Sequence, residues 1–245
     1  MSARSSQGKV RKKSGVAAMV RTARNFGLVM VLSTFLDGPI HATASDGDQP
    51  VTIAALGNSL VQGFGLPRKE GFTVQLEDWL HERNANAVIL NAGVSGDTTA
   101  GGLARIDWTI GSDIAALIVV LGGNDVLRGL DPGVSRKNLR GILEAASASG
   151  LPVLLVGHEV PDNYGPGYKR DFEAIYRDLA EEFGTLFYER FFAALEHGME
   201  RHEAARKYMQ DDGLHPNADG VRLIVESMGP RVLELVEIAR ARSPD

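Results

Sequence analysis

Continuous apolar runs of four to eight residues are the feature that most constrains the fold of this chain. Five of them follow residue 50, and they read VTIAAL, AVILNA, AALIVVLG, PVLLVG and TLFY. A strand with one face in water alternates apolar and polar residues, whereas a strand of a parallel sheet that is covered on both faces is apolar throughout. The runs therefore predict buried, parallel strands.

Segments with helical spacing separate these runs. Their apolar residues recur every three or four positions, as on one face of a helix, in residues 72–83, 135–149, 168–183 and 217–242. Gly229 and Pro230 predict a kink or a break in the last of these helices. The alternation of strands and helices predicts a single doubly wound α/β domain.

The N-terminal 44 residues have a different pattern. Basic residues precede the apolar run FGLVMVLSTFL, and HATAS follows it. This is the order of a secretory signal peptide, with Ala42, Thr43 and Ala44 as the small-residue cleavage site. The run is shorter than the about 20 apolar residues that a membrane-spanning helix needs. We expect residues 1–44 to be a cleavable signal peptide and residues 45–245 to form a periplasmic or secreted domain with no stable membrane insertion.

Composition excludes several classes of function. The chain of 245 residues has a net charge of −5, and loss of the signal peptide would remove seven basic residues but one acidic residue. The more acidic mature chain would repel phosphate backbones, so we expect no nucleic-acid partner. The chain has no cysteine. Disulfides, thiol catalysis and cysteine-ligated metals are therefore excluded.

Polar residues follow the predicted strands at the places where a ligand would bind. Ligands of open parallel sheets bind beyond the carboxyl ends of the strands. Ser59 follows the first strand, Gly93 the second and Asn124 the third, and Asp212 and His215 precede the last helix. These residues supply a hydroxyl, a backbone N–H, an amide and an Asp/His pair, which acyl transfer requires.

Each residue type has a role in that chemistry. A serine hydroxyl becomes nucleophilic when an imidazole takes its proton, and a carboxylate then orients the imidazole. Asp212 and His215 are three residues apart, close enough for this pairing. The N–H groups of Ser59 and Gly93 and the side-chain amide of Asn124 are suitable donors to an oxyanion.

These motifs resemble the SGNH subgroup of the GDSL hydrolase family. The four blocks read GNSL, NAGVSGDTTAGG, GGND and DGLH, and GFGLP, NYGPGY and DGLHPNADG are similar to stretches of the bacterial thioesterase I and arylesterase branch. The resemblance implies a three-layer, flavodoxin-like α/β fold with a five-stranded parallel sheet. It also implies Ser59 as nucleophile, His215 as base, Asp212 as its orienter, and Ser59, Gly93 and Asn124 as the oxyanion hole. The chain departs from the family at Asn58, where an aspartate is usual.

Three further residues are candidates for substrate binding. Tyr164 lies in a Gly/Pro-rich loop after the fourth strand, and the resemblance implies a mobile loop that contacts substrate there. A surface turn is the alternative. Phe64 and Leu66 are candidates for the apolar wall of the same site, and core packing is equally compatible with their sequence.

Simpler structural roles compete with these assignments. Ser59 alone would be read as a helix cap. Asp211 is a rival to Asp212 as the orienter of His215, although it lacks the spacing of the block. Asp125 is interpreted as a structural residue.

A metal site is a further alternative. His197, His202 and Glu203 suggest one, but they lie on a charge-rich helix that has no third or fourth ligand of the usual kind. We expect neither a metal nor a cofactor.

The sequence thus predicts a serine hydrolase that cleaves small carboxylic esters, and thioesters, through an acyl-enzyme. A carbohydrate O-deacetylase would use the same residues in a more polar cleft. A catalytically silent binding module of the same fold is the alternative outside the enzymes. The predicted partner is a small-molecule ester or thioester, and the sequence indicates no oligomeric state.

Overall fold

A computed structural model describes residues 49–196, 198 and 200–242 of the chain. The predicted signal peptide and His197 lie outside these described residues. The strands, each of which matches a predicted apolar run, are β1 (Val51–Gly57), β2 (Ala87–Gly93), β3 (Ala116–Val120), β4 (Val153–Val156) and β5 (Leu186–Tyr188).

The strands form one five-stranded sheet in the order β2-β1-β3-β4-β5. All neighbouring pairs are parallel. This is the strand order of flavodoxin-like folds, in which the order reverses beside the first strand. The predicted fold class is confirmed.

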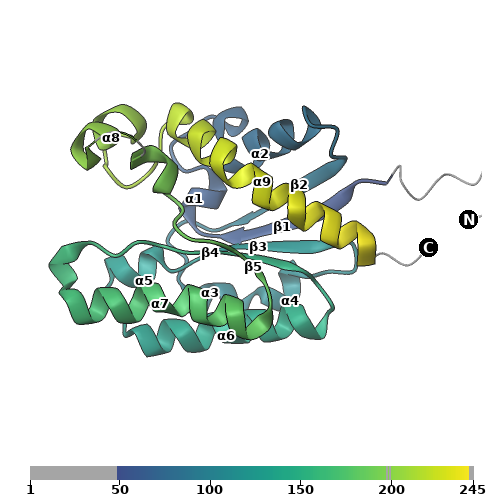
Figure 1. Ribbon diagram of the computed structural model, residues 1–245, viewed down its shortest axis with the longest axis horizontal. Coiled ribbons are helices and arrows are strands. Elements are labelled where there is room, and N and C mark those ends of the chain that lie inside the picture. Colours follow the sequence, from purple (N-terminus) through teal and green to yellow (C-terminus); the bar gives the residue numbers. More distant parts are fainter. Residues whose placement is uncertain (1–48, 197, 199, 243–245) are drawn as a thin grey trace, which may run out of the picture. The chain divides into compact units, whose positions relative to one another are not determined.

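Helices cover both faces of the sheet (Figure 1). On one face lie α1 (Ser59–Gln62), α2 (Phe72–His81), α8 (Arg201–Tyr208) and α9 (Ala218–Arg242). On the other lie α3 (Thr99–Ala104), α4 (Ile106–Thr109), α5 (Gly123–Leu127), α6 (Pro132–Ala148) and α7 (Pro166–Phe183). Short 3-10 helices are η2 (Arg68–Glu70), η3 (Asp162–Tyr164) and η4 (Ala193–Glu196). Each face has its own apolar core against the sheet.

Local sequence sets the ends of the long helices. The Asp131 side chain caps α6 by accepting from the N–H groups of Gly133 and Val134 at 2.8 and 3.3 Å, and Pro132 follows at the first helical position, where no N–H is needed. Helix α7 ends at Phe183, and Gly184 caps it with a φ of 62°, which suits glycine.

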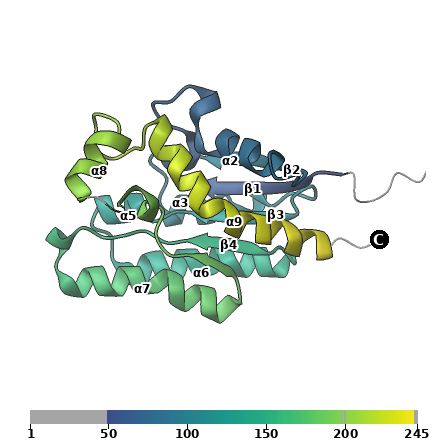
Figure 2. The same cartoon turned by 45° about the horizontal axis from the view of Figure 1, so that its top comes forward.

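Helix α9 passes through Pro230 without a break. Of the predicted kink or break, the break is therefore wrong. Met228 and Val232, on either side of the proline, are fully buried in the core, and Gly229 packs so closely under the Trp79 ring that a Cβ would lie 2.7 Å from it. This packing holds the helix across a residue that otherwise disfavours it. Figure 2 shows α9 lying along the sheet.

No helix in the part of the chain that the structure describes is both long enough and apolar enough to cross a membrane.

Candidate active site

The turn after β1 presents Ser59 at the carboxyl end of the sheet. Asn58 caps α1, because its Oδ1 accepts from the Leu60 N–H at 3.0 Å. Ser59 is thus the first residue of the helix and not its cap. A Cβ at Gly57 would overlap the Val61 side chain. The glycine therefore permits the close return of the helix onto the strand.

Ser59, His215 and Asp212 form a chain of hydrogen bonds. Ser59 Oγ lies 2.8 Å from His215 Nε2, and His215 Nδ1 lies 2.6 Å from Asp212 Oδ2. The other carboxylate oxygen, Oδ1, accepts from the backbone N–H groups of Leu214 and His215 at 2.9 and 3.0 Å. The hydrogen bond from the His215 ring, followed by that from the Leu214 N–H, lowers the pKa of Asp212 to about 2.

Gln210 holds the His215 turn against the loop that carries Phe64. Its N–H donates to the His215 carbonyl at 2.8 Å, and its side-chain Nε2 donates to the carbonyls of Phe64 and Pro216 at 2.8 and 2.9 Å. The rings of Phe64 and His215 lie 4.6 Å apart, centroid to centroid. The imidazole is thus fixed by packing as well as by Asp212.

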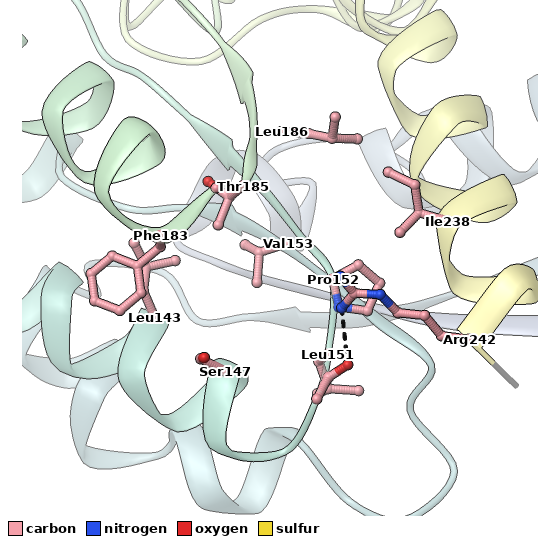
Figure 3. Close-up of a pocket in the computed structure, with 12 residues that line it drawn as sticks. Leu143, Ser147, Leu151, Pro152, Val153, Phe183, Thr185, Leu186, Ile238 and Arg242 are labelled. Atoms are coloured by element: carbon pink, nitrogen blue, oxygen red, sulfur yellow. Dashed lines mark hydrogen bonds between the residues drawn. The ribbon is translucent and has the colours of Figure 1, made fainter.

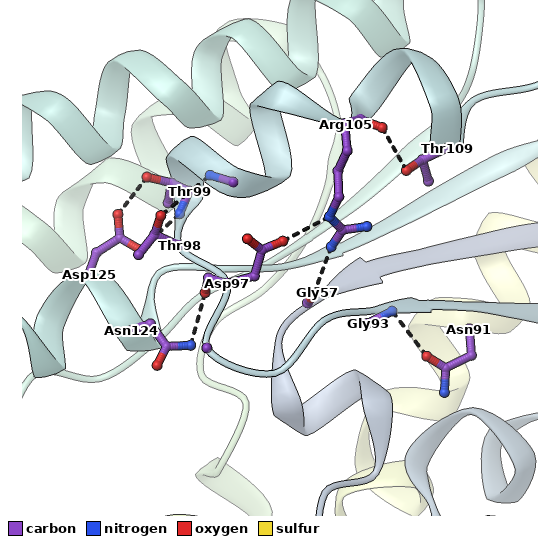
Figure 4. Close-up of polar contacts among 12 residues, drawn as sticks. Gly57, Asn91, Gly93, Asp97, Thr98, Thr99, Arg105, Thr109, Asn124 and Asp125 are labelled. Atoms are coloured by element: carbon purple, nitrogen blue, oxygen red, sulfur yellow. Dashed lines mark hydrogen bonds and ion pairs between the residues drawn. The ribbon is translucent and has the colours of Figure 1, made fainter.

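Three residues beside the Ser59 hydroxyl have an N–H hydrogen without a partner among the described residues. Asn124 Nδ2 donates one hydrogen to the Asp97 carbonyl at 2.9 Å (Figure 4), which leaves its second hydrogen available. The backbone N–H groups of Ser59 and Gly96 have no hydrogen-bond partner among the described residues. Ser59, Gly96 and Asn124 line one pocket.

Gly93 lies outside this pocket, contrary to its expected role. Its N–H donates to Asn91 Oδ1 at 3.0 Å (Figure 4), and it is not among the lining residues. A Cβ at Gly93 would lie 2.8 Å from the Asn58 carbonyl oxygen, so the glycine allows β2 to pack on the turn before Ser59. The chain reaches the pocket at Ser95 and Gly96, and the φ of 80° at Gly96 suits glycine.

The carboxylates of Asp97 and Asp125 form hydrogen bonds that hold the loops around the pocket in place (Figure 4). Arg105 Nε donates to Asp97 Oδ2 at 2.8 Å, and Arg105 Nη2 donates to the Gly57 carbonyl at 2.9 Å. Asp125 is fully buried and accepts from the Thr99 N–H at 2.9 Å and from the Ser135 hydroxyl at 3.0 Å. The contacts of Asp125 are those of a structural residue, as its sequence context predicts.

The pocket beside Ser59 has a volume of about 310 Å³ and mainly apolar walls. Phe64, Leu127, Phe192 and Leu214 contribute to them. Leu66 does not, because it packs against the core between the sheet and α9.

Tyr164 also lies outside the pocket. Its ring stacks on Tyr168 at 5.2 Å. Lys169 ties the preceding segment to α7, since its Nζ donates to the Val160 carbonyl at 2.7 Å and pairs with Asp162 at 3.2 Å. The residues that the structure adds to the expected set are Gly96, Gln210 and His158, which also lines the pocket.

A second pocket, of about 210 Å³, lies at the amino ends of β4 and β5 (Figure 3). Ser147 and Thr185 contribute hydroxyls, and Arg242 donates to the Gly150 carbonyl at 3.2 Å. None of its described lining residues is histidine, aspartate or glutamate. Ser147 therefore has no base there.

No cluster of metal-ligating side chains is present among the described residues. His202 and Glu203 lie exposed on α8.

Comparisons with known proteins agree with this geometry. The model of the GDSL-like lipase/acylhydrolase family matches residues 55–223. The chain belongs to this family. Esterase TesA of Pseudomonas aeruginosa is 33% identical over 76% of this chain and 89% of its own length. Thioesterase 1/protease 1/lysophospholipase L1 of Escherichia coli K12 is 34% identical over 85% of this chain and 91% of its own.

The family assignment extends to solved structures. The crystal structure of AlinE4, an SGNH-hydrolase family esterase, is 39% identical to this chain. Its TM-score is 0.62, and the match covers 82% of this chain and all of that one.

Proposed function

We propose that the chain is a serine esterase that also hydrolyses acyl thioesters through an acyl-enzyme. The observation that carries the proposal is the hydrogen-bond chain from Ser59 Oγ to His215 Nε2 at 2.8 Å and from His215 Nδ1 to Asp212 Oδ2 at 2.6 Å. The names of the two curated relatives support both activities.

In this mechanism Ser59 Oγ attacks the carbonyl carbon of the ester while its proton passes to His215 Nε2. Asp212, whose hydrogen bond with the His215 ring lowers its pKa to about 2, is ionised and stabilises the imidazolium that forms. The protonated His215 then donates its proton to the leaving alcohol or thiol. A water molecule repeats the sequence on the acyl-enzyme and releases the acid.

The developing oxyanion needs donors that are already in place. We assign this role to the N–H groups of Ser59 and Gly96 and to the second amide hydrogen of Asn124, which line the same pocket. Gly96 thus replaces Gly93 in the expected set. The apolar walls favour acyl or alkyl chains over a sugar, so an esterase is preferred to a carbohydrate O-deacetylase.

A fluorophosphonate probe tests the nucleophile. The wild-type protein should be labelled at Ser59, identified by mass spectrometry of its peptides, and Ser59→Ala should not be labelled. Ser95 supplies the matched control, because it lines the same pocket but its hydroxyl is bonded to Gln62 and not to a histidine. Ser95→Ala should still be labelled. Absence of labelling in the wild type would favour the silent binding module.

A panel of p-nitrophenyl esters and acyl-CoA thioesters of increasing chain length then tests the substrate class. Hydrolysis of both classes is expected. Removal of acetyl groups from acetylated sugars, without turnover of either class, would contradict the proposal.

We also propose that residues 1–44 are removed on export. The order of basic residues, apolar run and Ala42-Thr43-Ala44 supports this. N-terminal sequencing of the protein from its native host should start at or near Ser45, in a fraction outside the cytoplasmic membrane. An intact Met1 in the cytoplasm would refute it.

A further inference from the structure

His158 is a buried histidine at the wall of the active-site pocket. It follows β4, lines the pocket with Ser59, and is 5% exposed. Aromatic rings surround it, with centroids at 6.0 Å for Tyr176 and 6.4 Å for Phe191. Its Nε2 has no hydrogen-bond partner among the described residues. A buried ring nitrogen without a hydrogen bond is tolerated best when it carries no proton, because an unpaired buried donor is rarer than an unpaired acceptor.

The other edge of the ring faces Gly123. A Cβ at Gly123 would lie 3.7 Å from both Nδ1 and Cε1 of His158. The same point lies 3.6 Å from Asn58 Nδ2. The Asn58 oxygen is already occupied by the Leu60 N–H, which orients the amide hydrogens toward this place. Two nitrogen groups from different elements thus converge on the bare backbone of Gly123.

The chemistry of the two groups indicates what they would bind. Burial lowers the pKa of His158 to about 4, so its ring is neutral near pH 7. A neutral imidazole has one N–H and one acceptor nitrogen. The tautomer with hydrogen on Nδ1 leaves an unprotonated Nε2 among the aromatic rings and avoids an orphaned buried donor. The Asn58 amide and the His158 Nδ1–H then both donate toward Gly123.

We propose that Asn58 and His158 form a polar patch that donates hydrogen bonds to an oxygen atom of the substrate. This would be an ether, hydroxyl or carbonyl oxygen in its acyl or alcohol chain. The enzyme would thereby prefer oxygen-bearing esters to hydrocarbon esters of equal size. This inference rests on the proposed esterase function.

Isosteric ester pairs test it. In the acyl pair, p-nitrophenyl 3-methoxypropanoate is compared with p-nitrophenyl pentanoate. In the alcohol pair, 2-methoxyethyl acetate is compared with butyl acetate. The quantity measured is the ratio of kcat/KM for the ether to kcat/KM for the alkyl ester. Comparison of this ratio between variants cancels the intrinsic reactivity of each ester.

Three variants alter the patch in different ways. His158→Met replaces the imidazole by an apolar chain, and His158→Gln retains a hydrogen-bonding group. Gly123→Ala covers the patch with a methyl group whose nearest neighbours would lie at 3.6 Å, an ordinary contact, so this variant should fold. His202→Met is the matched control, because His202 is exposed on α8 and lines no part of this pocket.

In at least one pair, the ratio should fall by about tenfold in His158→Met and in Gly123→Ala, the size expected when a polar group loses its partner. His158→Gln should stay within about threefold of the wild type, and His202→Met should match it. An unchanged ratio in both pairs, in an active enzyme, would overturn the inference alone. Failure of the wild type to hydrolyse any of the four esters would instead overturn the proposed function, and this inference with it.

Discussion

The pockets at the two ends of the sheet each contain a serine hydroxyl but differ in the groups that partner it. At the carboxyl ends, the Ser59 hydroxyl is bonded to a histidine and that histidine to an aspartate. At the amino ends, Ser147 lines a pocket whose described lining has no acidic residue and no histidine. The Thr185 hydroxyl there has no hydrogen-bond partner in the described part of the chain. A serine in a cavity is therefore no sign of catalysis by itself. Its reactivity depends on the base beside it.

The difference follows from the architecture. In a parallel sheet all carboxyl ends lie at one edge, so the loops that leave β1, β2 and β3 meet there. Those loops bring in Ser59, Gly96 and Asn124. The amino-end pocket is instead built from the ends of α6, α7 and α9 and the starts of β4 and β5, and its described lining contains no acidic residue and no histidine.

The largest expected effect separates the two serines. Ser59→Ala and His215→Ala should each lower kcat by a factor on the order of 10⁶, because a nucleophile and its base act as one unit. Ser147→Ala should leave kcat unchanged. Steady-state hydrolysis of p-nitrophenyl butyrate measures all three. If a folded Ser59→Ala variant turned over substrate as fast as the wild type, Ser59 would not be the nucleophile and would not differ from Ser147.

The next effect concerns which aspartate orients His215. Asp212→Asn should lower kcat by about 10⁴, since an amide in place of the carboxylate favours the wrong tautomer of the imidazole. Asp211→Asn is the matched control. Asp211 is exposed and lies next to Asp212 in the chain, but the His215 ring is bonded to Asp212 and not to Asp211. Equal losses in the two variants would mean that charge near the site matters and that orientation does not.

Loss of one oxyanion donor should have a smaller effect. Asn124→Ala is expected to lower kcat by about 10²–10³, because the N–H groups of Ser59 and Gly96 remain. Saturation kinetics with one ester separate kcat from KM. A change confined to KM would make Asn124 a residue that binds the substrate and not the transition state.

The hydrogen bond between Asp212 and His215 should also affect how the free energy of unfolding depends on pH. The pKa of Asp212 falls from 3.8 to about 2 on folding, so ionised Asp212 stabilises the native state above about pH 4, and this contribution is lost as the pH falls toward 2. Denaturant unfolding of the wild type and Asp212→Asn between pH 6 and 2 measures it. The difference between the two should shrink on acidification. A constant difference would contradict the lowered pKa.

The smallest effect lies in the amino-end pocket. Thr185→Val keeps the side-chain shape but removes a buried hydroxyl for which residues 49–196, 198 and 200–242 offer no hydrogen-bond partner. The free energy of unfolding should rise by about 1 kcal/mol, since an unsatisfied buried polar group destabilises the folded state. Urea unfolding measures it, with kcat as an unchanged control. A loss of stability would show that the hydroxyl is solvated.

The fold was predictable because its determinants are local. All five strands lie at continuous apolar runs. Burial on both faces explains the runs of β1, β3 and β4. The predicted burial is wrong for the edge strands, because Val88 and Leu90 of β2 are exposed and β5 is half-buried. The motifs around Ser59, Asn124, Asp212 and His215 were equally visible, since each residue follows a strand or precedes a helix. A search of the residue after the fourth strand by the same rule would also have found His158.

Only the tertiary structure decided which groups face the pocket. The second block contains four glycines, and the structure places Gly96 at the pocket, whereas the Gly93 N–H donates to Asn91 Oδ1. Tyr164 and Leu66 have suitable chemistry but pack elsewhere. The patch beside Gly123 joins groups 100 residues apart in the chain, Asn58 and His158. Residue type and spacing determine local conformation and chemistry, whereas contacts between distant segments, and the hydrogen bonds left unmade, depend on how the whole chain packs.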